Sequence, residues 1–213
     1  MAVTAKPEGY YAVERSDMVA ELPRPLGRVL DVGCGEGGTG RALRAAGATA
    51  VWGVELMPEA ADRARAVLDG VVCAPVEEAL ASDTLAGPFD TICCYDVLEH
   101  LVDPPAVLAA LSRLAAPGAR LHISIPNARH LSLVLDLLFR GTFGYRDSGH
   151  RDRTHLRWYT RRDLVAIVDA AGWVTQWTRP SELAGRVRAA DRLTLGRAKE
   201  LLTLQWHLLA VAR

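Results

Sequence analysis

The sequence predicts a single α/β domain in which a mostly parallel sheet of seven strands is covered by helices on both faces. Strand-like apolar segments alternate with helix-like segments along most of the chain, the pattern of parallel strands joined by crossover helices. A glycine-rich run follows the first strand directly, as in sheets that bind ligands at their carboxyl edge. Half of the 213 residues are hydrophobic, enough for one large core.

Apolar runs and the residues that break them define the first half of the predicted fold. The expected strands are Arg28–Val32, Ala50–Val54, Val71–Ala74, Phe89–Tyr95 and Ala119–Ile125. The expected helices between them are Thr39–Ala46, Pro58 to about Leu68, and Pro104–Ala115. Gly47 is a stop signal for the first helix, and Pro58 suits the first turn of the second.

The pattern changes after the fifth strand, which Pro126 ends. Thr160 is a good N-cap for a following helix, and Gly172 closes that helix. The expected elements are, in order, a helix His130–Phe139, a polar loop Gly141–His155, a helix Arg161–Ala171, a strand Trp173–Trp177, a mostly helical segment Leu183–Leu202 and a strand Gln205–Val211. These strands bring the total to seven. Without a repeat or a low-complexity linker, residues 1–213 are interpreted as one domain.

Charge and cysteine content narrow the classes of protein. The chain has 25 basic and 25 acidic residues, and this zero net charge argues against a protein that coats nucleic acid or a membrane. Seven arginines between Arg140 and Arg162, interleaved with acidic residues and histidines, form either a solvated loop or a substrate loop. The four cysteines form no CxxC pair and are expected to be reduced core or near-core residues. With no apolar leader and no span-length apolar stretch, a cytoplasmic location is expected.

The run Asp31-Val-Gly33-Cys-Gly35-Glu-Gly37-Gly38 is the first candidate for ligand binding. Glycines allow a tight turn and close approach of backbone to ligand, and the next helix directs its first N–H groups there. Glu55 ends the second strand and suits a ribose diol. The spacing also satisfies the dinucleotide pattern GxGxxG. Asp31 favours S-adenosylmethionine over a dinucleotide as the cofactor. A carboxylate at this position suits the cationic amino-acid end of S-adenosylmethionine, whereas it repels the pyrophosphate of a dinucleotide.

Three runs resemble class I S-adenosylmethionine-dependent methyltransferases: VLDVGCGEGGTGRAL, FDTICCYDVLEHLVDP and LAAPGARLHISIPN. The likeness covers about residues 10–180 and implies a Rossmann-like fold, with S-adenosylmethionine as cofactor and S-adenosylhomocysteine as product. It implies the following cofactor contacts: Asp31, Gly33 and Gly35 around the methionine portion, Glu55 on the ribose hydroxyls, Met57 against adenine, and Tyr95. Relatives commonly carry an acidic residue where Pro75 stands. Pro75 cannot bond the adenine amino group, so the backbone of Val76 is the expected substitute.

The N-terminal residues 1–25 are expected to form a helix that covers the cofactor, as in similar proteins. Tyr11 and Arg15 lie in this segment, and Arg15 could pair with the cofactor carboxylate. An ordinary amphipathic helix is the alternative.

Asp96, Glu99 and His100 follow the fourth strand with a spacing of i, i+3 and i+4, which places them on one face if the segment is helical. The resemblance extends to quinone-type and small-RNA ribose methyltransferases that use a metal. They carry Glu-x-x-Glu-His here and a later histidine before an aromatic-Thr segment, as His155 precedes Trp158-Tyr159-Thr160. The candidate Mg²⁺ ligands are therefore Asp96, Glu99, His100 and His155. Many relatives keep the Glu-His pair without a metal, so Mg²⁺ stays open.

The loop around Gly149-His150-Arg-Asp152-Arg-Thr-His155 supplies the candidate general bases. Imidazole has an unperturbed pKa near neutrality, which suits His150 and His155 to removing a proton from an acceptor. Residues 127–160 are interpreted as the acceptor-binding insertion. His122, His130 and His207 lack such neighbouring titratable residues in the sequence and are expected to be structural.

The carboxyl half is similar to methyltransferases of polysaccharide and glycoside biosynthesis, through SIPNARHLSL and GHRDRTHLRWYTRRDLVAIVDAAGW. Arg, Asp and His suit a polyol, and Trp158 and Tyr159 could stack on a sugar ring or belong to the core. The leading hypothesis is thus an O-methyltransferase for a carbohydrate or glycoside hydroxyl. Its partner would be a small-molecule or oligosaccharide acceptor, without nucleic acid or membrane, and a homo-oligomer stays open. The alternatives are a phenol or quinone-like acceptor, an RNA ribose, an NAD(P) oxidoreductase and a non-catalytic cofactor-binding subunit.

Overall fold

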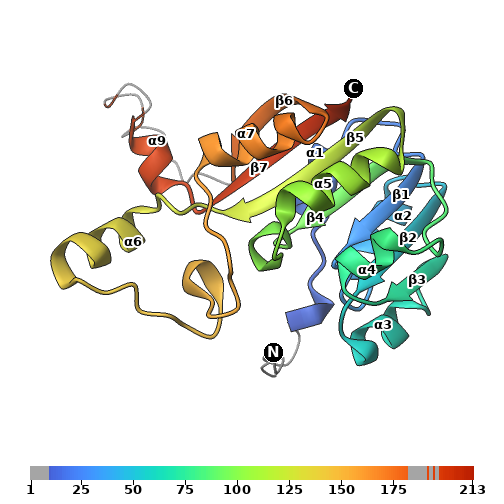
Figure 1. Ribbon diagram of the computed structural model, residues 1–213, viewed down its shortest axis with the longest axis horizontal. Helices are drawn as coiled ribbons and strands as arrows, with labels where there is room; N and C mark the ends of the chain where they lie inside the picture. Colours follow the sequence, from blue (N-terminus) through green and yellow to red (C-terminus); the bar gives the residue numbers. More distant parts are fainter. Residues whose placement is uncertain (1–9, 182–190, 192–193, 195–196) are drawn as a thin grey trace.

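The computed structural model describes residues 10–181, 191, 194 and 197–213 and centres on a seven-stranded sheet of order β3-β2-β1-β4-β5-β7-β6 (Figure 1). The strands are β1 (Arg28–Val32), β2 (Ala50–Glu55), β3 (Gly70–Cys73), β4 (Phe89–Tyr95), β5 (Ala115–Pro126), β6 (Trp173–Pro180) and β7 (Gln205–Ala212). The strands β1 to β5 pair in parallel, and β7 runs antiparallel to β5 and β6. This arrangement confirms the predicted fold class.

Helices cover both faces of the sheet. Those described are the α-helices α1 (Ser16–Glu21), α2 (Gly38–Ala45), α3 (Pro58–Ala64), α4 (Val76–Ala81), α5 (Pro104–Arg113), α6 (Leu131–Leu135), α7 (Arg161–Ala170) and α9 (Arg197–Leu202), with the shorter turns η1 (Tyr10–Ala12), η2 (Leu98–His100), η3 (Asp136–Arg140) and η4 (Gly149–Arg151). One core cluster contains the buried faces of α4, α5 and α7, and the other those of α1, α2 and α3. The apolar faces of the sheet are therefore removed from water on both sides.

The central strand β4 shows why the sequence forms a buried sheet. Its residues from Thr91 to Cys94 are fully buried, as expected for a parallel strand covered on both faces. Cys93 and Cys94 belong to opposite core clusters, as the alternation of side chains along a strand predicts. All four cysteines are free, but Cys73 is exposed, so the expectation that every cysteine lies in or near the core was wrong for Cys73.

Several elements differ from the sequence expectations. Helix α4 was not expected, although Pro75 before it and two glutamates in its first turn are favourable start signals. The π-helix η3 continues from α6 to Arg140. The strand β6 extends to Pro180 because β7 is long enough to pair with it. The N-terminal segment is not one helix: residues 1–9 lie outside the described part, and η1 and α1 are separate. Part of the segment Leu183–Leu202 also lies outside it, and α9 covers its end.

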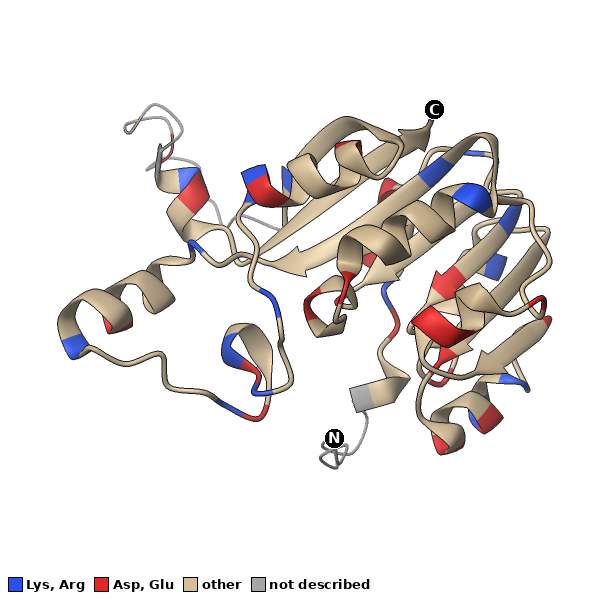
Figure 2. Cartoon of the chain, in the orientation of Figure 1, with Lys and Arg blue, Asp and Glu red and all other residues tan. Residues whose placement is uncertain are grey.

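Residues 127–160 extend away from the sheet with α6 at their tip (Figure 1). The segment returns at Thr160, where a capping box with Asp163 begins α7, as the N-cap prediction required. Figure 2 shows that both basic and acidic residues lie along this segment. In the described residues, no helix combines the length and apolarity that crossing a bilayer requires.

Candidate functional site

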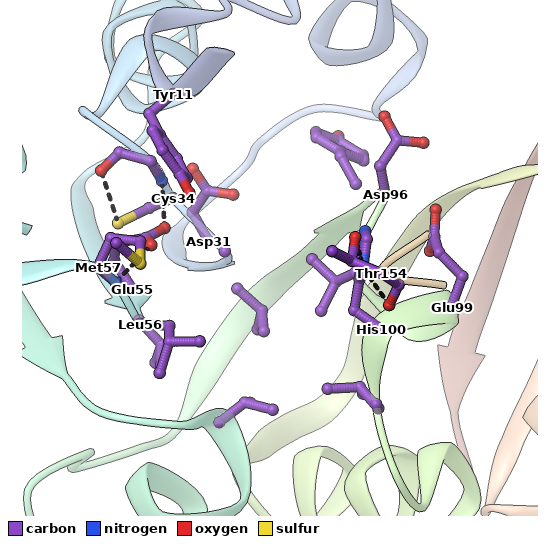
Figure 3. A pocket seen from close by; sticks show the side chains of 18 of the residues that line it. Tyr11, Asp31, Cys34, Glu55, Leu56, Met57, Asp96, Glu99, His100 and Thr154 are labelled. Carbon is purple, nitrogen blue, oxygen red and sulfur yellow. Dashed lines mark hydrogen bonds between the residues drawn. The ribbon is translucent and has the colours of Figure 1, made fainter. Parts of the chain in front are cut away.

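A cavity of about 670 Å³ lies at the carboxyl ends of β1, β2 and β4 (Figure 3). The nine predicted cofactor residues all line it: Tyr11, Arg15, Asp31, Gly33, Gly35, Glu55, Met57, Val76 and Tyr95. Parallel strands end at one edge of the sheet, which gathers residues that are distant in sequence. Figure 3 shows two groups across the cavity, with Asp31 and Glu55 in one and Asp96, Glu99 and His100 in the other.

The glycine loop lies directly beneath the N-terminal segment. Gly33 and Gly35 have φ of 72° and 54°, conformations that side chains other than glycine rarely adopt. A Cβ on Gly35 would lie 2.4 Å from the backbone oxygen of Tyr11. That same oxygen accepts a hydrogen bond from the backbone N–H of Glu36 at 2.8 Å. The loop therefore needs glycine both for its turn and for the close approach of the segment above it.

Glu55 is held in place by the loop that it supports. Its Oε2 accepts the N–H of Gly35 at 2.9 Å, and its Oε1 accepts the N–H of Met57 at 2.8 Å. The carboxylate is only 6% exposed. Because each carboxylate oxygen can accept more than one hydrogen bond, the fixed group still has acceptor capacity for a pair of hydroxyls. This geometry fits the ribose of the predicted cofactor.

Asp31 is a buried carboxylate, and one of its oxygens accepts no hydrogen bond from the described residues. Its Oδ2 has no hydrogen-bond partner among the described residues, and the side chain is 2% exposed. Burial, and then repulsion from Glu55, raise the pKa of Asp31 to about 7. An ionised carboxylate in such a place is costly unless a cation pairs with it. The position thus fits the ammonium group of S-adenosylmethionine.

Glu99, His100 and His155 form a second cluster, and their ligand atoms all lie within 4.8 Å of one another. Glu99 is 2% exposed, and neither of its carboxylate oxygens has a hydrogen-bond partner in the described part of the chain. Burial, and then the nearby Asp96, raise the pKa of Glu99 well above its usual value. The Nε2 of His155 lies 4.0 Å from Oε1 of Glu99. A carboxylate and two imidazoles are a donor set that fits a divalent cation.

Backbone pairing brings the insertion to this cluster. The N–H groups of Leu156 and Arg157 both donate to the backbone oxygen of Glu99, at 2.7 and 3.1 Å. Thr154 lies beside His100, with 3.2 Å between Oγ1 and Nδ1. These contacts fix His155 next to Glu99 although 56 positions separate the two residues in the sequence.

Asp96 departs from the predicted metal set. The helix that would have placed it beside Glu99 and His100 is absent, because Asp96 has a φ of 56° and η2 begins only at Leu98. The Asp96 carboxylate instead forms a salt bridge with Arg15. It also accepts hydrogen bonds from Ser124 Oγ at 3.3 Å and from Gln205 Nε2 at 2.7 Å. Three of the four predicted ligands are therefore brought together, and Arg15 has a protein partner.

The two candidate bases, His150 and His155, lie in different places in the structure. His155 lines the cavity, whereas the lining residues in the described part of the chain do not include His150. The His150 ring lies beside His130, with 5.1 Å between ring centroids. The aromatic pair separates too: Tyr159 is buried in the core, and the Trp158 ring contacts Phe143. The two aromatics therefore do not form one face for a sugar ring.

A polar network beneath the cavity was not anticipated. The hydroxyl of Tyr95 lies 2.9 Å from Nδ1 of His122, and the Glu21 carboxylate lies 3.1 Å from Nδ1 of His207 and 3.5 Å from Nε2 of His122. These residues come from β4, β5, β7 and α1. Only the alternation of side chains along the strands hinted that His122 would lie inside, and nothing in the sequence indicated its partners.

The lowered pKa of His122 predicts that the folded protein loses stability in acid. Burial lowers its pKa from 6.5, against the opposing effect of Glu21, with further lowering from His207 and Arg179. The unfolded chain then binds more protons than the folded one, so this contribution to stability is lost as the pH falls through about 6.5. Urea unfolding at pH 5 to 8 should show a shallower pH dependence for His122→Gln, which keeps a hydrogen-bonding group beside Tyr95. An unchanged pH dependence in that variant would contradict the assignment to His122.

Comparisons with known proteins agree with this geometry. A family model described as a methyltransferase domain matches residues 8–176. A ubiquinone biosynthesis O-methyltransferase of Xanthomonas oryzae is 32% identical over 185 residues, which cover 78% of this chain and 74% of the relative. Another of that name from Xylella fastidiosa is 35% identical over 151 residues, 62% of this chain and 59% of the relative.

Solved structures share the fold. An S-adenosylmethionine-dependent methyltransferase from Clostridium acetobutylicum superposes with a TM-score of 0.64 at 15% identity, over 92% of this chain and 90% of that one. The magnesium protoporphyrin IX methyltransferase of Synechocystis, solved with SAH, gives a TM-score of 0.57 at 21% identity, over 91% and 76%. At these identities the likeness concerns the fold alone.

Proposed function

The chain belongs to the methyltransferase domain family, and from this premise we propose that it methylates a hydroxyl group on an aromatic, phenol- or quinone-like acceptor with the help of a divalent cation. The protein is an S-adenosylmethionine-dependent O-methyltransferase. The observation that carries the proposal is the presence in a single cavity of the cofactor residues and of Glu99, His100 and His155.

The relatives and the lining of the cavity both favour an aromatic acceptor. The curated relatives described above are named for ubiquinone biosynthesis, which favours the aromatic alternative over the carbohydrate hypothesis. Apolar side chains suited to a flat ring also line the cavity, namely Val97, Leu101, Val102, Pro126 and Leu156. Together with the names of the relatives, these side chains favour an aromatic acceptor.

The chain's own residues orient the reactants and handle one proton. Asp31 would bind the ammonium group of the cofactor's methionine portion, and Glu55 would bind its ribose hydroxyls. S-adenosylmethionine supplies an already activated methyl group, so the protein mainly aligns the acceptor and excludes water. A cation held by Glu99, His100 and His155 would make an acceptor hydroxyl more acidic. Without a cation, His155 is the base that we propose to take the acceptor's proton.

The test is transfer of labelled methyl from S-adenosylmethionine to a catechol, a simple phenol, a mannoside and a rhamnoside, each with Mg²⁺ and with EDTA. We expect transfer to the catechol that EDTA lowers by about tenfold or more. Transfer to sugars alone would restore the carbohydrate acceptor. Transfer that survives EDTA would remove the cation and leave His155 as the base. Binding of S-adenosylhomocysteine without any transfer would indicate a non-catalytic subunit.

Two variants separate binding from turnover. His155→Ala should keep the affinity for S-adenosylhomocysteine and lose roughly 100-fold or more in turnover, because general-base residues contribute on that order. Glu55→Ala should weaken that affinity instead. His150→Ala is the matched control, since His150 does not line the cavity, and it should retain turnover. Retained turnover in His155→Ala would remove His155 from the mechanism.

A further inference from the structure

Asp96 is the point where four parts of the chain meet at the edge of the cavity. It follows β4, and its carboxylate contacts Arg15 from the N-terminal segment, Ser124 from β5 and Gln205 from β7. The backbone N–H of Asp96 also donates to the oxygen of Ser124 at 3.0 Å. Hydrogen bonds and salt bridges that involve an ionised group are among the stronger ones in proteins. The carboxylate is thus committed to structural partners on several sides.

The backbone of Asp96 is what turns its carboxylate toward Arg15. A φ of 56° is uncommon for a residue other than glycine, and such conformations persist only where the surroundings hold them. The conformation breaks the helical path that would align Asp96 with Glu99 and His100. Figure 3 shows the Asp96 carboxylate extending away from His100.

Arg15 carries the other half of the contact. It immediately precedes α1, and its side chain lines the cavity together with that of Tyr11. Four residues before it, the backbone oxygen of Tyr11 is bonded to the glycine loop through Glu36. The segment from Tyr11 to Arg15 therefore crosses the cavity with one end fixed to the glycine loop and the other to Asp96. Both members of the pair are partly buried, at 29% and 20% exposure, so solvent weakens the contact only in part.

We propose that Asp96 is a positioning residue that holds the N-terminal segment closed over the cofactor through Arg15, and that it is not a ligand of the divalent cation. This inference rests on the proposed function for the site that it closes. Cofactor binding then depends on the Asp96–Arg15 pair, whereas cation binding depends on Glu99, His100 and His155. Loss of the pair frees the segment and lets the cofactor dissociate faster.

The experiment is a double-mutant cycle with two separate readouts. S-adenosylhomocysteine affinity and dissociation rate, and Mn²⁺ affinity, are measured for the wild type, Asp96→Asn, Arg15→Gln and the double variant. Asparagine tolerates the left-handed conformation, so Asp96→Asn removes the charge without disturbing the turn. Each single variant should weaken S-adenosylhomocysteine binding on the order of tenfold, with faster dissociation, and the double variant should be no weaker than the singles. Mn²⁺ affinity should change less than about twofold.

Several outcomes would overturn the proposal. Additive losses in the double variant would mean that Asp96 and Arg15 act separately. A loss of Mn²⁺ binding in Asp96→Asn as large as in Glu99→Gln would make Asp96 a ligand. Asp62→Asn, which breaks an exposed pair between Asp62 on α3 and Arg65 just after that helix, is the matched control and should change neither affinity. If the wild type binds no Mn²⁺, the cation part of the proposed function fails, while the cofactor cycle still decides whether the pair closes the segment.

Discussion

Asp31→Asn should strongly weaken cofactor binding and, at the same time, stabilise the cofactor-free protein at pH 8. The pKa of Asp31 is raised to about 7 by burial and then by Glu55, so the folded state resists losing this proton. Because the pKa of Asp31 is higher in the folded than in the unfolded chain, the folded protein is most stable in acid. This stability is lost as the pH rises through the pKa of the folded state. The difference in pKa corresponds to a loss of roughly 4 kcal/mol in the free energy of unfolding.

Asparagine removes that cost because it does not ionise. Urea unfolding without cofactor should therefore show a more stable variant at pH 8 and little difference at pH 3 to 4. The variant also loses the negative charge that pairs with the cofactor's ammonium group, so S-adenosylhomocysteine affinity measured by calorimetry should fall roughly 100-fold or more. The exposed Asp83→Asn is the control for loss of a carboxylate in general. Equal affinity in Asp31→Asn, or lower stability at pH 8, would refute this account of the residue.

Glu99→Gln should remove cation binding and cation-dependent turnover while the cofactor still binds. Glu99 offers two buried carboxylate oxygens that accept no hydrogen bond from the described residues, and it lies beside two imidazoles. A neutral amide is a much weaker ligand for a hard divalent cation than a carboxylate. We expect turnover with Mg²⁺ to fall on the order of 100-fold and Mn²⁺ binding to disappear from titrations.

The same substitution has an informative effect on stability. Because the buried carboxylate oxygens accept no hydrogen bond in the described part of the chain, replacement by an amide should leave the metal-free protein as stable as the wild type, or more stable. S-adenosylhomocysteine affinity should stay within about threefold, since Asp31 and Glu55 are untouched. Glu59→Gln, at an exposed position on α3, is the matched control. Mg²⁺-dependent turnover that survives in Glu99→Gln would place the cation elsewhere or remove it.

Much of the fold and of the cofactor half of the site could be predicted because the relevant signals are local. The alternation of apolar runs with helical segments indicates parallel strands, and parallel strands end at one edge of the sheet. Residues at or just after the carboxyl ends of β1 and β2, such as Asp31, Gly35 and Glu55, must then lie close together whatever the details of packing. Seven of the nine predicted cofactor residues line the cavity for this reason, whereas Tyr11 and Arg15 reach it from the N-terminal segment.

The part of the site around Glu99 could not be predicted in full, because residue spacing in the sequence does not show where the backbone departs from a helix or which distant segments pair. The i, i+3, i+4 argument for Asp96 assumed a helix, and a single φ of 56° redirects the carboxylate to Arg15, 81 positions away. His150 and His155 looked equivalent as sequence, yet the pairing of Leu156 and Arg157 with Glu99 places only His155 in the cavity. Tyr159 became core for a similar reason, since Ala128 bonds to its backbone oxygen.

The sequence by itself thus determined the sheet, the glycine loop and the carboxylates of the cofactor site, because short-range patterns and the geometry of parallel strands fix them. Only the tertiary structure decided which long-range partners the titratable groups take: Asp96 with Arg15, Glu99 with His155, and Glu21 with His122 and His207. Those contacts depend on backbone conformations at individual residues and on segments far apart in the chain. The sequence gives the chemical type of each side chain, whereas the conformation of the folded backbone determines which partner that side chain contacts.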